Sequence, residues 1–320
     1  MESFYKIITE LKKAKTVAVF THLNPDGDAL GSAFATKSIL ENSGRTVNIY
    51  LEKEMPEKFS FLKADYIVGN PDGTLKEDVA SALDCGASAR LGKIEPLFKT
   101  AKKTLLIDHH KTSDSFCDIS YTDPLSAATC ELIYLLAKEF NVNIPYEAMK
   151  GIYTGISTDT GHFKYSNTTP KTLKIAADLI ERGLDFRKIT EVVYDTVRPE
   201  KLKFWGAVGE RIKIYDKTVA VLDACEDFLN EYNLSYEDVE ELPNMVSNIS
   251  GVKVGILIKS AEKPEDRKLS FRGRDLIDLS LLASHFGGGG HKNAAACVIH
   301  EPMETALPKI LEKINEMLKD

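Results

Sequence analysis

Short apolar runs in the first half of the chain each stop at a histidine or an aspartate. The runs and the polar residues that follow them are 16–20 with His22, 79–83 with Asp84, and 104–107 with Asp108 and His109. Buried strands of a parallel sheet have this continuous apolar character. Helical apolar spacing follows the first of these runs at 29–43 and the last of them at 127–140 and 146–154. The alternation predicts an α/β domain with a parallel sheet and polar residues at its carboxyl edge.

The second half of the chain has a different pattern. Helical spacing extends over 185–215, a hairpin is predicted at 212–222, and further strands at 252–259 and 268–272. The chain then carries four consecutive glycines and closes with an amphipathic helix. We therefore predict a smaller C-terminal α+β domain joined by a helical linker. The expected boundaries are 1–190 for the first domain, 191–213 for the linker and 214–320 for the second domain.

Charge and cysteine content narrow the class of protein. Among 320 residues, 48 are acidic and 41 are basic, a net charge of −7. This balance argues against charge-driven binding to long duplexes. The five cysteines are scattered, which favours a reduced cytoplasmic protein over a disulfide scaffold or a structural zinc site. No apolar run approaches the ~18 residues of a membrane span, and the N-terminus lacks the apolar core of a signal peptide.

Imidazoles and carboxylates gather in four short clusters near the predicted sheet edge. They are His22, Asp26 and Asp28 in one turn, Asp84 alone, the triplet Asp108-His109-His110, and Asp159. Two imidazoles and four carboxylates could hold two divalent cations, and a mixed nitrogen and oxygen shell suits manganese better than calcium. Such a pair stabilises both the attacking and the leaving oxygen of a phosphoryl displacement. Asp84 is the natural candidate to bridge the two ions because it stands alone at a strand end.

Each cluster alone has an ordinary explanation. Aspartate is common in a Pro-Asp-Gly-Asp turn, Asp159 could cap a helix, and a single His-His pair is weak evidence. The joint occurrence favours a site, because three separate predicted strands end in such residues on one edge of one sheet.

These motifs together resemble the DHH phosphoesterase superfamily. The string His-Leu-Asn-Pro-Asp-Gly-Asp-Ala-Leu-Gly-Ser at 22–32, then Asp84, Asp108-His109-His110 and Asp159-Thr-Gly, occur in the order of that family. The glycine run followed by His291 resembles the Gly-Gly-Gly-His motif of the DHH-associated C-terminal domain. The compact two-domain layout is most similar to NrnA-type oligoribonucleases and pAp phosphatases.

The resemblance implies a role for each matching residue. His22 and Asp26 would hold one manganese ion, Asp28, His109 and Asp159 the other, and Asp84 would bridge them. Asp108 would orient neighbouring ligands, and His110 would contact the scissile phosphate as a general acid. The substrate would be bound by Arg272, Gly288, Gly289, Gly290 and His291. Magnesium or cobalt could replace manganese.

The function that follows is a cytoplasmic, manganese-dependent phosphoesterase. It would hydrolyse short single-stranded RNA (nanoRNA) to mononucleotides and convert pAp (3′-phosphoadenosine 5′-phosphate) to AMP, and a homodimer is plausible. The alternatives are a phosphodiesterase acting mainly on pApA or cyclic dinucleotides, a pyrophosphatase, and a non-catalytic nucleotide sensor. Ala296 stands where the family usually has glycine, which leaves the substrate preference open.

Overall fold

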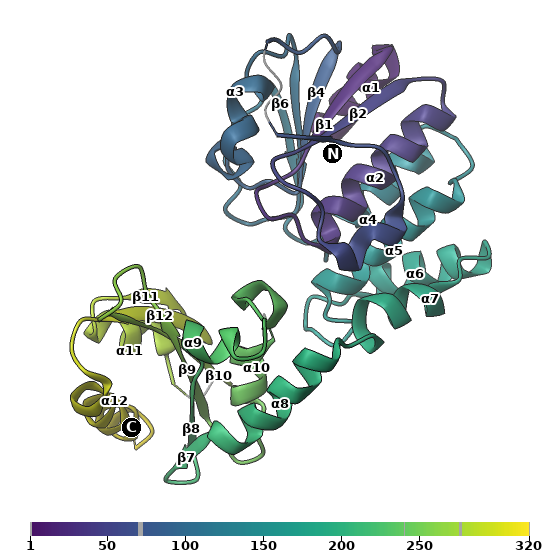
Figure 1. Ribbon diagram of the computed structural model, residues 1–320. Helices are drawn as coiled ribbons and strands as arrows, with labels where there is room; N and C mark the ends of the chain where they lie inside the picture. The colour runs from purple at the N-terminus through teal and green to yellow at the C-terminus, as the bar shows by residue number, and fades with distance from the viewer. Residues whose placement is uncertain (1, 70–72, 240, 275–276, 320) are drawn as a thin grey trace. The chain divides into compact units, whose positions relative to one another are not determined.

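A computed structural model describes residues 2–69, 73–239, 241–274 and 277–319. The chain forms two compact units, residues 1–196 and 197–320. Each unit is built around its own six-stranded sheet, the first parallel and the second mixed (Figure 1). The predicted α/β fold with a smaller C-terminal α+β unit is confirmed.

The parallel sheet has the strand order β3-β2-β1-β4-β5-β6. Its strands are β1 (Thr16–Phe20), β2 (Thr46–Leu51), β3 (Ile67–Val68), β4 (Val79–Leu83), β5 (Thr104–Asp108) and β6 (Ile119–Thr122). The chain moves outward from β1 to β3 and then returns to the other side of β1 with β4. Open α/β sheets bind their ligands at this reversal, beyond the carboxyl ends of the strands. The reversal falls between β1, which precedes His22, and β4, which precedes Asp84.

Apolar side chains cover both faces of this sheet, which explains why its central strands β1, β4 and β5 are nearly continuous apolar runs. Val17 and Val19 of β1 belong to one core, and Ala18 and Phe20 to the other. The first core is closed by α1 (Glu2–Lys13), α2 (Gly27–Asn42), η1 (Glu57–Leu62), α4 (Thr129–Glu139) and α5 (Tyr146–Asp159). The second is closed by η2 (Ser88–Ile94) and α3 (Glu95–Phe98).

Two glycines allow α2 and α5 to cross at close range. A Cβ on Gly151 would lie 2.6 Å from the carbonyl oxygen of Gly31, closer than real Cβ atoms approach other atoms. Gly155, one turn further along α5, leaves space for Asp28, whose Oδ1 would lie 2.5 Å from an added Cβ. The crossing therefore places the first turn of α2 beside the last turns of α5.

The helical stretch predicted over 185–215 is broken, so that prediction is wrong in part. After α6 (Pro170–Glu181), the stretch consists of α7 (Phe186–Thr190), the π-helical η3 (Glu191–Asp195), α8 (Pro199–Arg211) and then the strand β7 (Lys213–Tyr215). Arg198 is extended, with φ −65° and ψ 142°, because the ring of Pro199 disfavours the helical region for the residue before it.

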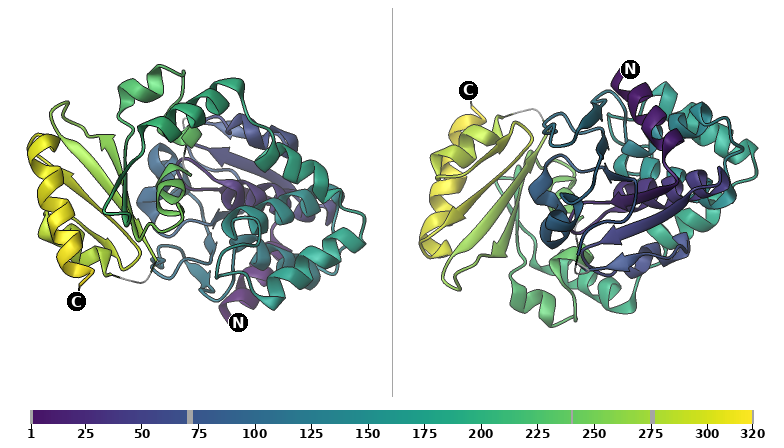
Figure 2. Two further views of the ribbon diagram at one scale, coloured as in Figure 1. Left: turned by 90° about the horizontal axis from the view of Figure 1, so that it is seen from below. Right: turned by 90° about the horizontal axis from the view of Figure 1, so that it is seen from above.

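The second sheet has the order β11-β12-β10-β9-β8-β7 and is antiparallel except for the β8–β9 pair. Its further strands are β8 (Val219–Asp223), β9 (Val254–Ser260), β10 (Arg267–Gly273), β11 (Gly289–His291) and β12 (Ala294–Ile299). One face is covered by α11 (Leu279–His285) and α12 (Met303–Met317), and Figure 2 shows α12 lying along that face. The other face packs on α8, α9 (Glu226–Asn230), η4 (Tyr236–Val239) and α10 (Leu242–Ser247).

No helix in the described part of the chain combines the length and the apolar character needed to cross a membrane.

Candidate metal centre

The six side chains predicted to bind metal come together at the carboxyl edge of the parallel sheet. They form two groups of three, in each of which one ligating atom per residue lies within 4.8 Å of the others. The groups are His22, Asp26 and Asp84, and Asp28, His109 and Asp159; a further group of the same kind joins Asp84 and His109 to His110. They come from the loops after β1, β4 and β5, the start of α2 and the end of α5.

Both imidazoles are oriented by backbone carbonyl groups. His22 Nδ1 lies 2.8 Å from the carbonyl oxygen of Leu23, and His109 Nδ1 lies 3.2 Å from that of Ser126. A carbonyl oxygen only accepts, so each ring donates its Nδ1–H, which leaves Nε2 as the nitrogen that a metal ion would use. In each ring Nε2 is the atom that faces the carboxylates. Histidines that ligate metals have this arrangement.

Asp84 lies between the two groups. Its Oδ2 is 3.8 Å from His22 Nε2, and its Oδ1 is 3.6 Å from His109 Nε2. Its φ of 55° is in the left-handed region, which aspartate tolerates better than most residues. Non-glycine residues held in this conformation concentrate at functional sites. One carboxylate is therefore positioned to serve both groups.

The two aspartates at the start of α2 have different environments. Asp26 is the N-cap of α2, and its Oδ1 accepts the amides of Asp28 and Ala29, each at 3.0 Å. These two bonds are the ordinary role of aspartate in a Pro-Asp-Gly-Asp turn, and Asp26 is also a member of the first group of candidate ligands. Asp28 is fully buried, and its two oxygens accept the backbone amides of Thr129 and Cys130 at 2.6 and 2.9 Å.

The electrostatics of the cluster favour a cation. Burial raises the pKa of Asp28 to about 7, and burial together with neighbouring carboxylates raises the pKa of Asp84 well above its usual range. Burial lowers the pKa of His22. Burial also acts to lower the pKa of His109, but the hydrogen bond with Asp159 and the nearby carboxylates raise it to about 10. The carboxylates of Asp28, Asp84 and Asp159 repel one another with little water between them, and a divalent cation would relieve that repulsion.

His110 is held by a buried carboxylate rather than by a backbone group. Its Nδ1 donates to Asp108 Oδ1 at 2.7 Å, and Asp108 is fully buried. This hydrogen bond raises the pKa of His110. Burial acts to raise the pKa of Asp108, but the bond from His110 brings it below its usual range. The side chain of His110 is 37% exposed, so a ligand can reach the ring.

The predicted substrate-binding residues lie in the second unit, on β10 and on β11 with the residue before it, and β12 runs between these two strands. Ala294 of β12 pairs with Arg272 of β10 on one side and with His291 of β11 on the other. Directly paired residues share a face of the sheet, so the guanidinium and the imidazole lie on one face with a methyl group between them. Arg272 is half-buried, and burial lowers its pKa.

The glycine run serves strand packing. An added Cβ on Gly288 would overlap the carbonyl oxygen of Ala296, and Gly290 has φ 149°. These two residues are glycines because β11 approaches β12 closely. A Cβ on Gly289 would meet nothing within 4 Å. Ala296, the departure from the family pattern, pairs with Gly289 and has space beside it.

Sequence reasoning missed the groups that orient the ligands. The carbonyl groups of Leu23 and Ser126 and the hydroxyl of Thr129 contact predicted ligands. A backbone carbonyl carries no signal in the sequence, and Thr129 stands far from the other residues along the chain.

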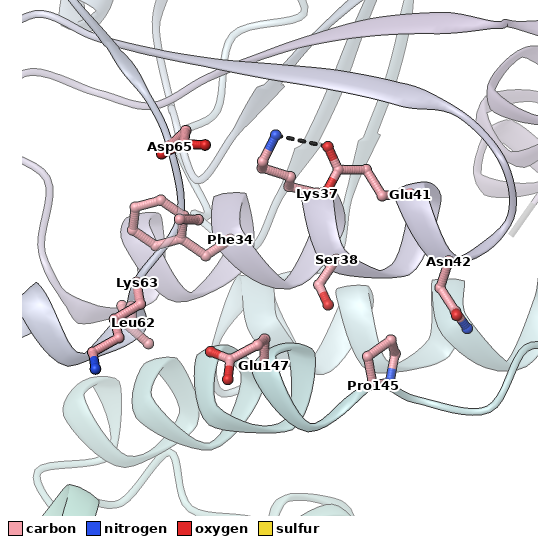
Figure 3. Close-up of a pocket in the computed structure, with 11 residues that line it drawn as sticks. Phe34, Lys37, Ser38, Glu41, Asn42, Leu62, Lys63, Asp65, Pro145 and Glu147 are labelled. Carbon is pink, nitrogen blue, oxygen red and sulfur yellow. Dashed lines mark hydrogen bonds and ion pairs between the residues drawn. The ribbon is translucent and has the colours of Figure 1, made fainter.

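A surface pocket of about 690 Å³ lies away from the cluster (Figure 3). It lies between the C-terminal half of α2 and the N-terminus of α5, whereas the cluster is at the opposite end of each helix. Among its lining residues, Lys37 pairs with Glu41 at 2.7 Å. None of the predicted site residues lines this pocket.

A doubly wound parallel sheet with imidazoles and carboxylates at its reversal point defines an α/β protein with a candidate divalent-metal centre. Residues 16–156 match the DHH family, N-terminal domain, and residues 216–320 match the DHHA1 domain. The chain belongs to the DHH family.

The likeness to known proteins covers both units. The chain is 31% identical over 317 residues to the uncharacterized protein MG371 of Mycoplasma genitalium, which covers 97% of this chain and 94% of that protein. It is 26% identical over 318 residues to the bifunctional oligoribonuclease and PAP phosphatase NrnA of Bacillus subtilis, with 98% of each chain covered. The crystal structure of an exopolyphosphatase-related protein from Bacteroides fragilis superposes with a TM-score of 0.84 at 26% identity, covering 100% of this chain and 98% of that one.

Proposed function

We propose that this protein is a phosphoesterase that uses two divalent cations, manganese foremost, to hydrolyse short oligoribonucleotides to mononucleotides and pAp to AMP. The observation that carries the proposal is the position of Asp84 between two imidazoles that both present Nε2. The activity named for the Bacillus subtilis relative, which is similar over nearly the whole chain, supports the choice of substrates.

The donor set fits transition-metal dications. Each group offers one imidazole nitrogen and carboxylate oxygens, with His22, Asp26 and Asp84 around one position and Asp28, His109 and Asp159 around the other. Mixed nitrogen and oxygen donors suit manganese, whereas calcium takes nearly all oxygen. Bound there, the cations would supply a hydroxide nucleophile and neutralise charge on the phosphate.

His110 and Asp108 provide acid catalysis in this proposal. Asp108 fixes the Nδ1–H of His110 and favours the protonated ring. A protonated His110 donates a hydrogen bond to the phosphate and then gives its proton to the leaving nucleoside oxygen. Water adds to phosphorus and the bond to that oxygen breaks. Removal of the 3′-phosphate of pAp and cleavage of RNA both break such a bond, so one site serves both reactions.

The second unit recognises the nucleotide in this proposal. Arg272 offers a planar fork of donors for a terminal phosphate, and His291 lies on the same face of the sheet. The small side chain of Ala294 between them leaves room for the anion. Gly289 adds a stretch of backbone that is open to solvent. These groups would select short substrates that carry a terminal phosphate.

The test is a side-by-side kinetic panel with manganese. The purified protein should release mononucleotides from labelled di- to pentaribonucleotides and phosphate from pAp. Asp84→Ala should abolish both activities, whereas Asp266→Ala, which removes a buried carboxylate of the second unit, should retain them. Absence of both activities in the unmodified protein rejects the proposal. Faster turnover of pApA or pyrophosphate than of RNA and pAp identifies a different substrate for the same site.

A further inference from the structure

The loop before α4 and the first turn of α4 contain no predicted metal ligand, yet they contact three of them. The carbonyl oxygen of Ser126 lies 3.2 Å from His109 Nδ1. The hydroxyl of Thr129 donates to Asp84 Oδ1 at 2.9 Å, and the amide of Thr129 donates to Asp28 Oδ2 at 2.6 Å. The three ligands come from α2 and from the loops after β4 and β5, so this short stretch fixes their positions relative to one another.

Thr129 makes its contacts where water does not compete. Thr129 and Asp28 are fully buried, and Asp84 is 1% exposed. The N-cap of α4 is Ala128, which has no side-chain oxygen to satisfy the first amides of the helix. Asp28 satisfies them from α2, and the positive end of the helix stabilises its charge. These hydrogen bonds hold the carboxylates of Asp28 and Asp84 in place beside the other predicted ligands.

Lys171 in α6 and Asn167 just before that helix hold this stretch in place. Lys171 donates to Ser126 Oγ at 3.0 Å and pairs with the buried Glu131 at 3.1 Å. Asn167 donates to the carbonyl oxygen of Ala127 at 3.2 Å. The residues on either side of Thr129 are therefore held by groups that are not ligands, which fixes the position of its hydroxyl beside Asp84.

Asp84 Oδ1 lies 3.6 Å from His110 Nδ1 and the same distance from His109 Nε2, too far for a hydrogen bond to either nitrogen. His110 Nδ1 already donates its one hydrogen to Asp108. The hydroxyl of Thr129 does lie within hydrogen-bond distance, and without it Oδ1 is free to turn away from the position between the two groups of ligands. The bond from Thr129 keeps the two oxygens of Asp84 divided between the groups.

We propose that Thr129 is the positioning residue for the shared carboxylate, and that its hydroxyl, acting through Asp84, maintains a paired-metal site. This inference rests on the proposed metal binding. It concerns assembly of the site, whatever the substrate is.

The test compares variants that differ by one hydroxyl. Thr129→Val keeps the size of the side chain and the backbone amide but removes the donor, and Thr129→Ala removes it without adding a methyl group to the pocket. Thr129→Ser restores the donor. Thr36→Val is the matched control, because Thr36 is buried and its hydroxyl has no hydrogen-bond partner among the described residues.

Manganese binding is measured by calorimetry, and the coupling of the two ions by low-temperature electron paramagnetic resonance. Loss of a group that orients a metal ligand typically lowers affinity about 10–100-fold. We expect that loss, with a change from a coupled to an uncoupled manganese signal, in Thr129→Val and Thr129→Ala. Thr129→Ser and Thr36→Val should behave as the unmodified protein. Thermal unfolding in the absence of metal shows which variants are folded.

The inference is overturned if a folded variant without the hydroxyl binds manganese with full affinity and gives the coupled signal. It is also overturned if the unmodified protein binds no pair of ions. The proposed function fails separately, when the unmodified protein binds two ions but hydrolyses neither RNA nor pAp. In that case the loss of metal pairing in Thr129→Val still supports the role of Thr129.

Discussion

Gly151→Ala tests whether the close crossing of α2 and α5 assembles the metal centre. The added Cβ would lie 2.6 Å from the carbonyl oxygen of Gly31, and ordinary contacts begin at about 3.4 Å. The obstacle is backbone, so no side-chain rotation relieves it. The two helices must separate by about 0.8 Å, the difference between these distances. That movement displaces Asp28 on α2 relative to Asp159 on α5.

The expected effect on stability has two opposing parts. Overpacking costs about 1–3 kcal/mol, and the upper end applies here because the clash is between two backbones. Alanine in place of glycine inside a helix regains about 1 kcal/mol. We therefore expect a net loss of about 2 kcal/mol. The displacement also exceeds the ~0.5 Å tolerance of a preorganised site, so manganese affinity should fall at least about tenfold.

The matched control is Gly206→Ala in α8, where an added Cβ meets nothing within 4 Å. This variant should gain up to about 1 kcal/mol. Urea unfolding is followed by circular dichroism and by the fluorescence of Trp205, the only tryptophan, which lies in the second unit. Manganese affinity is measured by calorimetry. A Gly151→Ala protein that is as stable as the unmodified chain and binds manganese equally well would refute the reasoning.

Three further predictions concern catalysis, binding and pH. His110→Ala should lower kcat about 10²–10⁴-fold while calorimetry shows unchanged manganese affinity, and an unchanged kcat would contradict its role as acid. Arg272→Gln should raise KM for pAp about 10–100-fold with kcat little changed. That factor corresponds to the loss of one or two hydrogen bonds to a charged group. In the presence of a metal chelator, the free energy of unfolding in urea should fall as the pH rises from 5 to 7. Burial raises the pKa of Asp28 from 3.8 to about 7, so over this range the folded state holds a proton that the unfolded state has lost. Stability that rises over this window would contradict the shift.

The core of the first unit could be predicted because parallel strands are buried on both faces. The runs that form β1, β4 and β5 are mostly apolar, and each is followed by polar residues at the sheet edge. The pattern gave no comparable signal for β6 (Ile119–Thr122), which is half-buried at the edge of the sheet. The first helix, Glu2–Lys13, was also missed, although its apolar side chains fill the core. The mixed charges of its exposed face indicate only that the segment lacks the apolar core of a signal peptide.

The identity of the site residues followed from residue type, but their orientation did not. Histidine and aspartate at strand ends indicated metal-binding chemistry at one edge of the sheet. Which nitrogen of His22 and His109 would face the carboxylates depends on the carbonyl groups of Leu23 and Ser126. The role of Thr129 depends on the packing of α4 beside Asp84. These are tertiary contacts, and no local pattern encodes them.

The most direct measurement is anomalous diffraction from crystals of the full chain grown with manganese. We predict two manganese peaks that share Asp84 as a common ligand. One peak should be bound by His22, Asp26 and Asp84, and the other by Asp28, His109, Asp159 and Asp84. Manganese found only elsewhere on the molecule, or a single ion that Asp84 does not touch, would contradict the account.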